Sequence, residues 1–297
     1  MNRGWQDAWP APAKLNLFLH VVGRRADGYH LLQSVFRLID LADTLRFAPR
    51  ADGAVRLAAP LAGVPESADL TVRAATLLRA EAGIEAGVTI TVDKRIPLGG
   101  GLGGGSSDAA TTLIALNELW GAGVPPERLA QLGLRLGADV PFFLFGRSAF
   151  AEGIGEVLTA VELPAAWYLV ISPQVSVPTQ EIFSDPGLTR DTKPVRIAVF
   201  FAGDGDSVQR GEGGDVPRGD GERWHNDLEP VVVKKFPAVG RALEWLRSAG
   251  VDGRMSGSGG CVFAAFGTED AARAVAAGVP EGMRAFVVKG LDTHPLA

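Results

Sequence analysis

Alternating apolar and polar residues predict several β-strands in the N-terminal third of the chain. Residues 14–22 form one such run, and after the turn-rich segment 23–28 strand-like sequence continues as far as Phe47. A further alternating run covers residues 88–92. The chain is therefore predicted to open with a β-rich unit.

Three runs with helical spacing accompany these strands. The first begins after Asp69, a residue type that caps helix starts, and stops near Gly83. The second is ended by Gly121, and the third starts after Pro125 and Pro126 and ends at Gly137. The apolar faces that these helices would bury are Ala74, Leu77 and Leu78 in the first, Ala109, Leu113, Leu116 and Trp120 in the second, and Leu129, Leu132 and Leu136 in the third.

The C-terminal half mixes the two patterns in the same way. Residues 168–171 read as a short buried strand, residues 242–246 as one face of a helix ahead of Gly250, and residues 261–266 as another strand. Residues 203–223 are almost all Gly, Asp, Glu, Arg and Ser, so they cannot bury enough apolar area to offset the entropy of ordering. We expect an α+β protein with a mobile insertion there.

Composition narrows the class of protein. At 297 residues, with 46% hydrophobic and 21% charged residues, the chain can bury a sizeable core and divide into two lobes. Its net charge of −5 comes without a long basic run, which argues against nucleic acid or an anionic membrane as a partner. The one cysteine, Cys261, excludes an internal disulfide, and the histidines show no metal-ligand spacing. Without an apolar signal core or a run of membrane-spanning length, a cytoplasmic location is expected.

The most informative motif is the glycine-rich run from Pro97 to Asp108, which leads into the second predicted helix. Glycines let backbone N–H groups approach an anion, and the helix directs the positive end of its dipole there. The dinucleotide pattern Gly-x-Gly-x-x-Gly also matches, but residues 93–98 separate the glycines from the preceding strand. A Walker A loop ends in Gly-Lys-Ser or Gly-Lys-Thr, whereas this run closes with Gly105-Ser106-Ser107 and has no lysine. We interpret the run as a phosphate loop of another kind.

A second glycine cluster, Gly253 to Gly260, precedes the strand at 261–266. It is either a tight turn or a second loop that converges with the first on one ligand, and sequence alone leaves both readings open.

Phosphoryl transfer needs a carboxylate to accept the proton of an acceptor hydroxyl and a cation to stabilise spreading charge. Asp139 and Lys14 fit these roles. The competing readings are a turn-forming aspartate beside Pro141 and a solvated lysine at the start of a strand. Spacing alone does not connect the two residues.

Five motifs together make the chain recognisable. They are Pro-Ala-Lys-Leu-Asn-Leu at 12–17, Gly-Tyr-His at 28–30, the run at 97–108, Gly-Ala-Asp-Val-Pro at 137–141 and Ser-Gly-Ser-Gly at 256–259. On these motifs the chain resembles the GHMP kinase superfamily from about residue 10 to about residue 290, apart from the insertion. The resemblance implies a two-lobed α+β kinase, with an N-terminal ATP-binding lobe (residues 1–153) and a C-terminal substrate lobe (residues 154–297) flanking a cleft.

The resemblance also implies a reaction. The γ-phosphate of ATP would pass to the 2-hydroxyl of a methylerythritol unit linked to cytidine diphosphate, a small-molecule substrate. Asp139 matches the catalytic base, and Lys14 matches the lysine that orients and polarises the hydroxyl. An ammonium nearby would keep the carboxylate ionised and assist the charge developing on the oxygen.

The positions that match the family's ATP-binding residues form one segment and one lysine before it. In that segment Ser106 and Ser107 would offer hydroxyls to phosphate or Mg²⁺. We expect Mg²⁺ with the nucleotide, held mainly by phosphates and water, because Glu118 lies about 18 Å along the helix from Ser106. The ATP-binding positions are Lys94, Pro97, Leu98, Gly99, Gly100, Gly101, Leu102, Gly103, Gly104, Gly105, Ser106 and Ser107.

The cytidine end is expected to lie between aromatic rings. The matching positions are Tyr29 and Phe183 for stacking and His30 for reading the base edge, although singly each is as well explained by strand pairing or core packing. Thr179 and Phe183 are four residues apart, so one helical turn would present both to the same cleft. The further substrate-lining positions are Asn16, Phe36 and Thr179.

Two alternative functions are weighed against this one. Another kinase of the superfamily, acting on homoserine, mevalonate or a sugar, has no pyrimidine for Tyr29 and His30 to contact. A non-catalytic nucleotide-binding protein does not require Lys14 and Asp139 together. The departures from the family pattern, Asp108 after the serine pair and Ser256 where threonine is also usual, do not change the expectation. We expect a monomer or a weak homodimer.

Overall fold

Two long antiparallel strands form the centre of the computed structural model, which describes residues 3–60, 63–196 and 224–297. They are β1 (Trp9–Arg24) and β2 (His30–Arg50), joined by the turn that contains Gly28. Their pairing is interrupted by register shifts after Pro12, Asn16 and Val21. The predicted strands at 14–22 and up to Phe47 are confirmed, and both extend further than the sequence pattern indicated.

The strands join one sheet in the order β3-β4-β2-β10-β7-β9-β8. β1 pairs with β2, while β5 pairs with both β2 and β6, off this path. Since the sheet continues from β4 through β2 to β7, it runs through both halves of the chain. The remaining strand bounds are β3 Val55–Leu57, β4 Gly87–Asp93, β5 Ala149–Glu152, β6 Val157–Ala160, β7 Trp167–Ser172, β8 Arg254–Met255, β9 Val262–Phe266 and β10 Arg284–Leu291.

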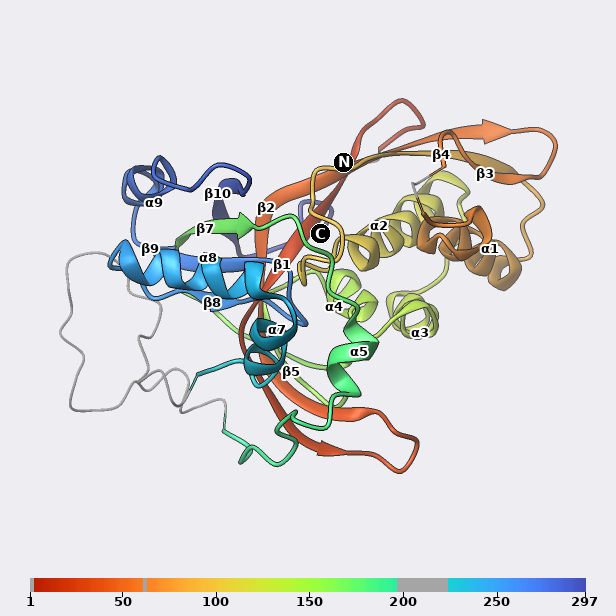
Figure 1. Cartoon of the computed structure of the whole chain (residues 1–297). Helices are drawn as coiled ribbons and strands as arrows, with labels where there is room; N and C mark the ends of the chain where they lie inside the picture. The colour runs from red at the N-terminus through yellow and green to blue at the C-terminus, as the bar shows by residue number, and fades with distance from the viewer. Residues whose placement is uncertain (1–2, 61–62, 197–223) are drawn as a thin grey trace.

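Helices cover the sheet in two groups, on opposite sides of β1 and β2 in Figure 1. Helices α1 (Leu70–Ala82), α2 (Gly104–Leu119), α3 (Pro126–Leu136) and α4 (Val140–Phe145) lie together on the right of these strands. Helices α8 (Pro237–Ser248) and α9 (Glu269–Ala276) lie on the left, with β7 and β9. The short elements are η1 (Glu66–Ala68), α5 (Thr179–Phe183) and α7 (Glu229–Lys235).

The helix signals in the sequence operate as predicted. The Asp69 carboxylate accepts from the N–H groups of Thr71 and Val72 at the start of α1, and Gly83 ends this helix with a left-handed φ of 65°. Of the apolar faces predicted for α1, α2 and α3, Leu77, Trp120 and Leu136 are only half-buried, while the others are buried. The mixed α+β fold class is confirmed. The insertion expected at 203–223 lies outside the described residues.

Candidate active site

The side chain of Lys14 on β1 reaches a carboxylate that is far away in the sequence. Its Nζ lies 3.4 Å from Oδ2 of Asp139, which sits on the turn before α4. The Lys14 side chain is only 4% exposed, whereas the Asp139 side chain is 35% exposed and lines a cavity of about 400 Å³. Lys14 is therefore a buried cation beneath a carboxylate that solvent or a ligand can reach.

A hydrogen-bond chain holds the Lys14 ammonium in place. Nζ of Lys14 donates to Oδ1 of Asn16, and Nδ2 of Asn16 donates to the Ser34 hydroxyl at 2.8 Å. The Ser34 hydroxyl in turn donates to the carbonyl of Phe18 at 2.6 Å. Nζ also lies 4.9 Å from the ring centroid of Phe36, in cation–π range. This network leaves the ammonium little freedom to turn away from Asp139.

The glycine-rich run and the second glycine cluster meet across the cavity. The Gly101 carbonyl accepts from the Ser256 hydroxyl at 3.1 Å, and the Gly100 carbonyl accepts from the Cys261 N–H at 3.0 Å. Gly101 has a φ of 75°, and a Cβ added there would stand 2.0 Å from the Ser256 carbonyl oxygen. Since Gly257 and Ser258 line the same cavity, the structure favours the converging loop over the plain turn, the two interpretations that the sequence left open.

The start of α2 faces this cavity without a side-chain cap among the described residues. Its N-cap is Gly103, in the left-handed region at φ 72°, and Gly104, Gly105 and Ser106 line the cavity. Uncapped N–H groups at a helix start form a site for an anion. The expectation that both serines offer hydroxyls is wrong for Ser107, which is buried and donates its hydroxyl to the Pro12 carbonyl at 2.6 Å.

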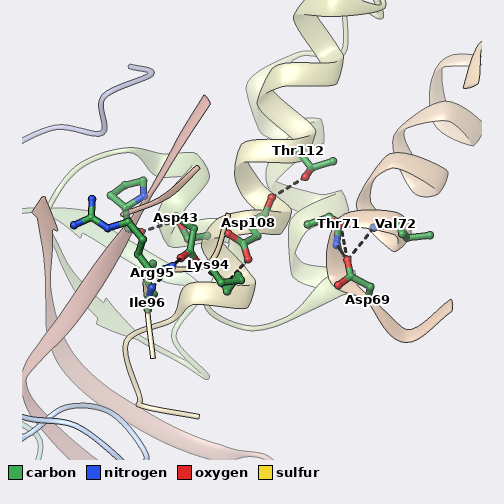
Figure 2. Close-up of polar contacts among 11 residues, drawn as sticks. Asp43, Asp69, Thr71, Val72, Lys94, Arg95, Ile96, Asp108 and Thr112 are labelled. Atoms are coloured by element: carbon green, nitrogen blue, oxygen red, sulfur yellow. Dashed lines mark hydrogen bonds and ion pairs between the residues drawn. The ribbon is translucent and has the colours of Figure 1, made fainter. Parts of the chain in front are cut away.

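Lys94 lies next to the loop within a cluster of acidic side chains (Figure 2). Its Nζ donates to the carboxylate of Asp43 on β2 and, at 2.7 Å, to Oδ2 of Asp108 on α2. Oδ1 of Asp43 also accepts from the N–H groups of Arg95 and Ile96. Two carboxylates thus compensate the charge of the ammonium. Through these hydrogen bonds Lys94 links β2, the start of the loop and α2. Lys94 also lines the cavity.

Burial and charge affect the two partners of this ion pair differently. Burial lowers the pKa of Lys94, but Asp108 and Asp43 outweigh it, so the net pKa lies above the usual value. Burial raises the pKa of Asp108 to about 7, with Lys94 opposing and the Asp43 carboxylate adding to the rise. Asp108 is therefore poised to take up a proton near neutral pH.

We expect Asp108→Asn to remove the contribution that the Asp108 carboxyl group makes to the pH dependence of the free energy of unfolding. The usual pKa of aspartate is 3.8, so between pH 4 and 7 folded Asp108 binds more protons than the unfolded chain, and the wild type loses stability as pH rises through this range. Asparagine does not titrate, so the difference in the free energy of unfolding, variant minus wild type, should increase from pH 5 to pH 8 by on the order of 2 kcal/mol, as measured by denaturant unfolding at each pH. Asp270→Asn, at an exposed position, is the control. A difference that does not change with pH contradicts the prediction.

A second hollow, of about 490 Å³, adjoins the main cavity. It is lined by Tyr29 and His30, which follow the turn after β1, and by Phe183 of α5. The His30 and Phe183 ring centroids are 5.1 Å apart, and Tyr29 is 59% exposed. His30 is buried, whereas the exposed ring of Tyr29 and the half-buried ring of Phe183 offer a stacking surface for a planar base. The residues shared with the main cavity are Leu32, Ala138, Ile154, Thr179 and Phe183.

The structure brings nearly all of the predicted site residues together. The main cavity is lined by both proposed catalytic residues, by every proposed ATP-binding residue except Ser107, and by Asn16, Phe36, Thr179 and Phe183. Thr179 and Phe183 begin and end α5, as the single helical turn predicted. Glu118 is remote, since its carboxylate accepts from the N–H of Arg3.

The sequence reading missed the residues that support the site from other elements. Asp43 is one of two aspartates in β2 and Arg190 lies in the segment after α5, and neither belongs to a motif. Ser34 carries no pattern either. Only their contacts in the fold reveal them.

The described residues hold neither a cluster of metal ligands nor a helix that could cross a membrane. No group of three or more His, Cys, Asp and Glu side chains within them is arranged to hold a metal ion. None of their helices combines the length and apolar character that a membrane crossing needs.

Comparison with known proteins gives consistent matches over both halves. The sequence model for the GHMP kinase N-terminal domain matches residues 69–147, and that for the GHMP kinase C-terminal domain matches residues 206–285. A protein of Thiobacillus denitrificans named 4-diphosphocytidyl-2-C-methyl-D-erythritol kinase is 58% identical, over 97% of each chain. The kinase of that name from Dechloromonas aromatica is 54% identical, over 97% of this chain and 98% of its own.

Solved structures match as well. A crystal structure of 4-(cytidine 5'-diphospho)-2C-methyl-D-erythritol kinase superposes with a TM-score of 0.79 at 36% identity, covering 96% of this chain and 99% of that one. Homoserine kinase from Cytophaga hutchinsonii superposes with a TM-score of 0.69 at 18% identity, over 97% of this chain and 94% of its own. The second match shows the shared fold alone.

Proposed function

This chain belongs to the 4-diphosphocytidyl-2-C-methyl-D-erythritol kinases of the GHMP kinase family, and on that premise we propose that it phosphorylates the 2-hydroxyl of 4-diphosphocytidyl-2-C-methyl-D-erythritol with ATP. The products are the 2-phosphate and ADP, in the non-mevalonate route to isoprenoid precursors. One observation carries the proposal most directly. The cavity that Lys14 and Asp139 line adjoins the aromatic hollow at Tyr29 and shares lining residues with it.

The glycine-rich run fits the triphosphate of ATP. The start of α2 presents uncapped N–H groups, and the glycines before it leave no side chain between backbone and ligand. Lys94 contributes little net positive charge, because Asp43 and Asp108 already compensate it. We infer that the backbone, rather than the Lys94 ammonium, holds the phosphates. Mg²⁺ would neutralise charge on the phosphates, which with water would be its main ligands.

Lys14 and Asp139 are the residues proposed to act on the acceptor hydroxyl. The Asp139 carboxylate would orient the hydroxyl and accept its proton as the oxygen–phosphorus bond forms and the bond to ADP breaks. The Lys14 ammonium, 3.4 Å from this carboxylate, would stabilise negative charge on the attacking oxygen. Because the cation is buried and hydrogen-bonded, it needs no rearrangement during the reaction.

The acceptor is tested by measuring ATP consumption with four candidate alcohols. We expect turnover with 4-diphosphocytidyl-2-C-methyl-D-erythritol and not with homoserine, mevalonate or galactose. Lys14→Met, purified in parallel, controls for a contaminating kinase. Turnover with a different acceptor alone would sink the proposal, and ATP binding without any turnover would favour a non-catalytic nucleotide-binding protein.

Tyr29→Ala is expected to weaken binding of the cytidine substrate, by about 1–3 kcal/mol by analogy with base stacking. The Tyr29 ring is exposed and makes part of the second hollow, so its loss should not disturb the core. The KM for the cytidine substrate should rise while the KM for ATP stays the same. Tyr29→Phe keeps the stacking surface and is the matched control. If Tyr29→Ala leaves the substrate KM unchanged, Tyr29 does not stack on the base.

Three further expectations from the sequence remain proposals. We propose a cytoplasmic location, no binding of nucleic acid or membrane, and a monomer or weak homodimer. Sedimentation at several protein concentrations tests the last of these.

A further inference from the structure

Arg190 connects the two elements that form the second hollow. Its Nε donates to Nε2 of His30 at 3.0 Å. Its Nη2 donates to the carbonyls of Phe183 at 3.0 Å and Asp185 at 2.7 Å, and its Nη1 donates to the carbonyl of Leu188 at 2.9 Å. One guanidinium thus ties the start of β2 to the end of α5.

The contact with His30 determines which ring nitrogen carries the proton. A guanidinium is always charged and only donates, so Nε2 of His30 must accept. In a neutral imidazole the other nitrogen then bears the hydrogen, so Nδ1 of His30 is a donor. Burial lowers the pKa of His30, and the charges of Arg190 and Arg24 lower it further, so the ring stays neutral at neutral pH.

The contacts with α5 fix the position of the aromatic ring. Phe183 is the last residue of this five-residue helix, and a short helix has little stability of its own. Arg190 holds two carbonyls at its end, at Phe183 and Asp185, while the Asp185 carboxylate pairs with Lys235 at 3.2 Å. The ring of Phe183 is thereby kept beside His30, with 33° between the two ring planes.

No carboxylate in the described part of the chain pairs with Arg190. Its donors go to one imidazole nitrogen and three backbone carbonyls, none of which neutralises its charge. Its acceptors among the described residues are all neutral, and two of them belong to residues that line the second hollow, so a role in positioning these acceptors explains this half-buried arginine better than an ion pair.

We propose that Arg190 is a positioning residue for base recognition, which makes His30 a fixed Nδ1 donor and keeps Phe183 beside it. Such a donor favours a pyrimidine whose ring nitrogen N3, between the two substituted carbons C2 and C4, is a hydrogen-bond acceptor. Cytosine has an acceptor at this position. Uracil presents N–H at that position, and two opposed donors leave both groups unpaired. The choice of base rests on the proposed function, whereas the tautomer of His30 does not.

The tautomer is measured by ¹⁵N NMR of the full chain labelled at histidine. The chain has four histidines, so the spectrum is simple, and His30→Gln assigns the signal. The wild type should show His30 protonated at Nδ1 and unprotonated at Nε2. Arg190→Met should lose this form, giving a mixture of tautomers. Arg190→Lys should retain it, because one donor to Nε2 remains, while it loses the carbonyl contacts on α5.

Calorimetric binding of CDP and UDP tests the consequence for recognition. Arg190→Met should lower the preference for CDP over UDP by about tenfold or more. In steady-state kinetics it should raise the KM for the cytidine substrate by about tenfold to a hundredfold and change kcat and the KM for ATP by less than about threefold. Arg190→Lys should keep the preference for CDP while both nucleotides bind more weakly. Arg273→Met, on the exposed side of α9, is the matched control and should change none of these values.

Two results would overturn the proposal. One is a wild-type spectrum that shows His30 protonated at Nε2. This measurement does not depend on any variant folding. The other is an Arg190→Met protein that keeps both the Nδ1–H form and the preference for CDP. Absence of turnover with the cytidine substrate would count against the proposed function instead, because the tautomer and CDP binding are measured without catalysis.

Discussion

Replacing Asp139 with alanine is expected to lower kcat by about a thousandfold or more, while ATP still binds. Asp139 is the carboxylate that lines the cavity beside the Lys14 ammonium, and its loss leaves this buried cation without its carboxylate partner, so the melting temperature should fall as well. The variant would leave the acceptor hydroxyl without a group to receive its proton. Single-turnover rates with saturating ATP measure the chemical step itself, and calorimetry measures nucleotide binding separately.

Asp139→Asn is the sharper form of this experiment, because it preserves the shape of the side chain while removing its proton-accepting carboxylate and its negative charge. It should be as inactive as the alanine variant. Since Lys14 acts through the same hydroxyl, the double variant Lys14→Met with Asp139→Asn should lose less than the product of the two single effects. Wild-type-like turnover in either Asp139 variant rules this residue out as the base.

Gly101→Ala is expected to raise the KM for ATP by at least about a hundredfold and to lower the free energy of unfolding by about 3 kcal/mol or more. The added Cβ would stand 2.0 Å from the Ser256 carbonyl oxygen and 2.9 Å from that of Gly259. Both are backbone atoms of the second glycine cluster, so neither can rotate away. The two loops would have to separate, and the phosphate loop would lose its shape. Melting temperature and the KM for ATP report the two effects.

Gly121→Ala is the matched control for this variant. Gly121 also has a left-handed φ, of 61°, but an added Cβ there would meet nothing within 4 Å. It should therefore cost only the backbone strain, about 1–2 kcal/mol, and leave the KM for ATP unchanged. If Gly101→Ala behaves like Gly121→Ala, contact between the two loops does not shape the ATP site.

Local sequence signals predicted the elements well because each signal acts over a few residues. Asp69 and Gly83 define the two ends of α1, through hydrogen bonds and backbone conformations at those ends. The half-burial of Trp120 and Leu136 was not predictable in this way, since it depends on how much of a helix end its neighbours cover. The breaks in the β1–β2 register belong to the same class, because they arise from pairing between strands.

The site was predicted from short sequence motifs. The contacts of the site residues with residues outside these motifs were not predicted. Ser106 and Ser107 read as a pair, yet adjacent helix residues point about 100° apart, so only Ser106 lines the cavity. Lys94 matched an ATP-binding position, but its partner Asp43 lies 51 residues away and is brought near only by the sheet. Arg190 has its effect through a contact across 160 residues.

The position of Cys261 behind the phosphate loop makes its thiol a chemical reporter of loop opening. It is the single cysteine of the chain, it is fully buried, and burial raises the pKa of its thiol to about 12. Its N–H bonds to Gly100, and a Cβ at Gly100 would lie 2.7 Å from its sulfur, so a reagent cannot reach the sulfur until the loop moves. The rate of alkylation therefore gives the frequency with which the unliganded loop opens, and its slowing by a nucleotide gives occupancy without any catalytic assay.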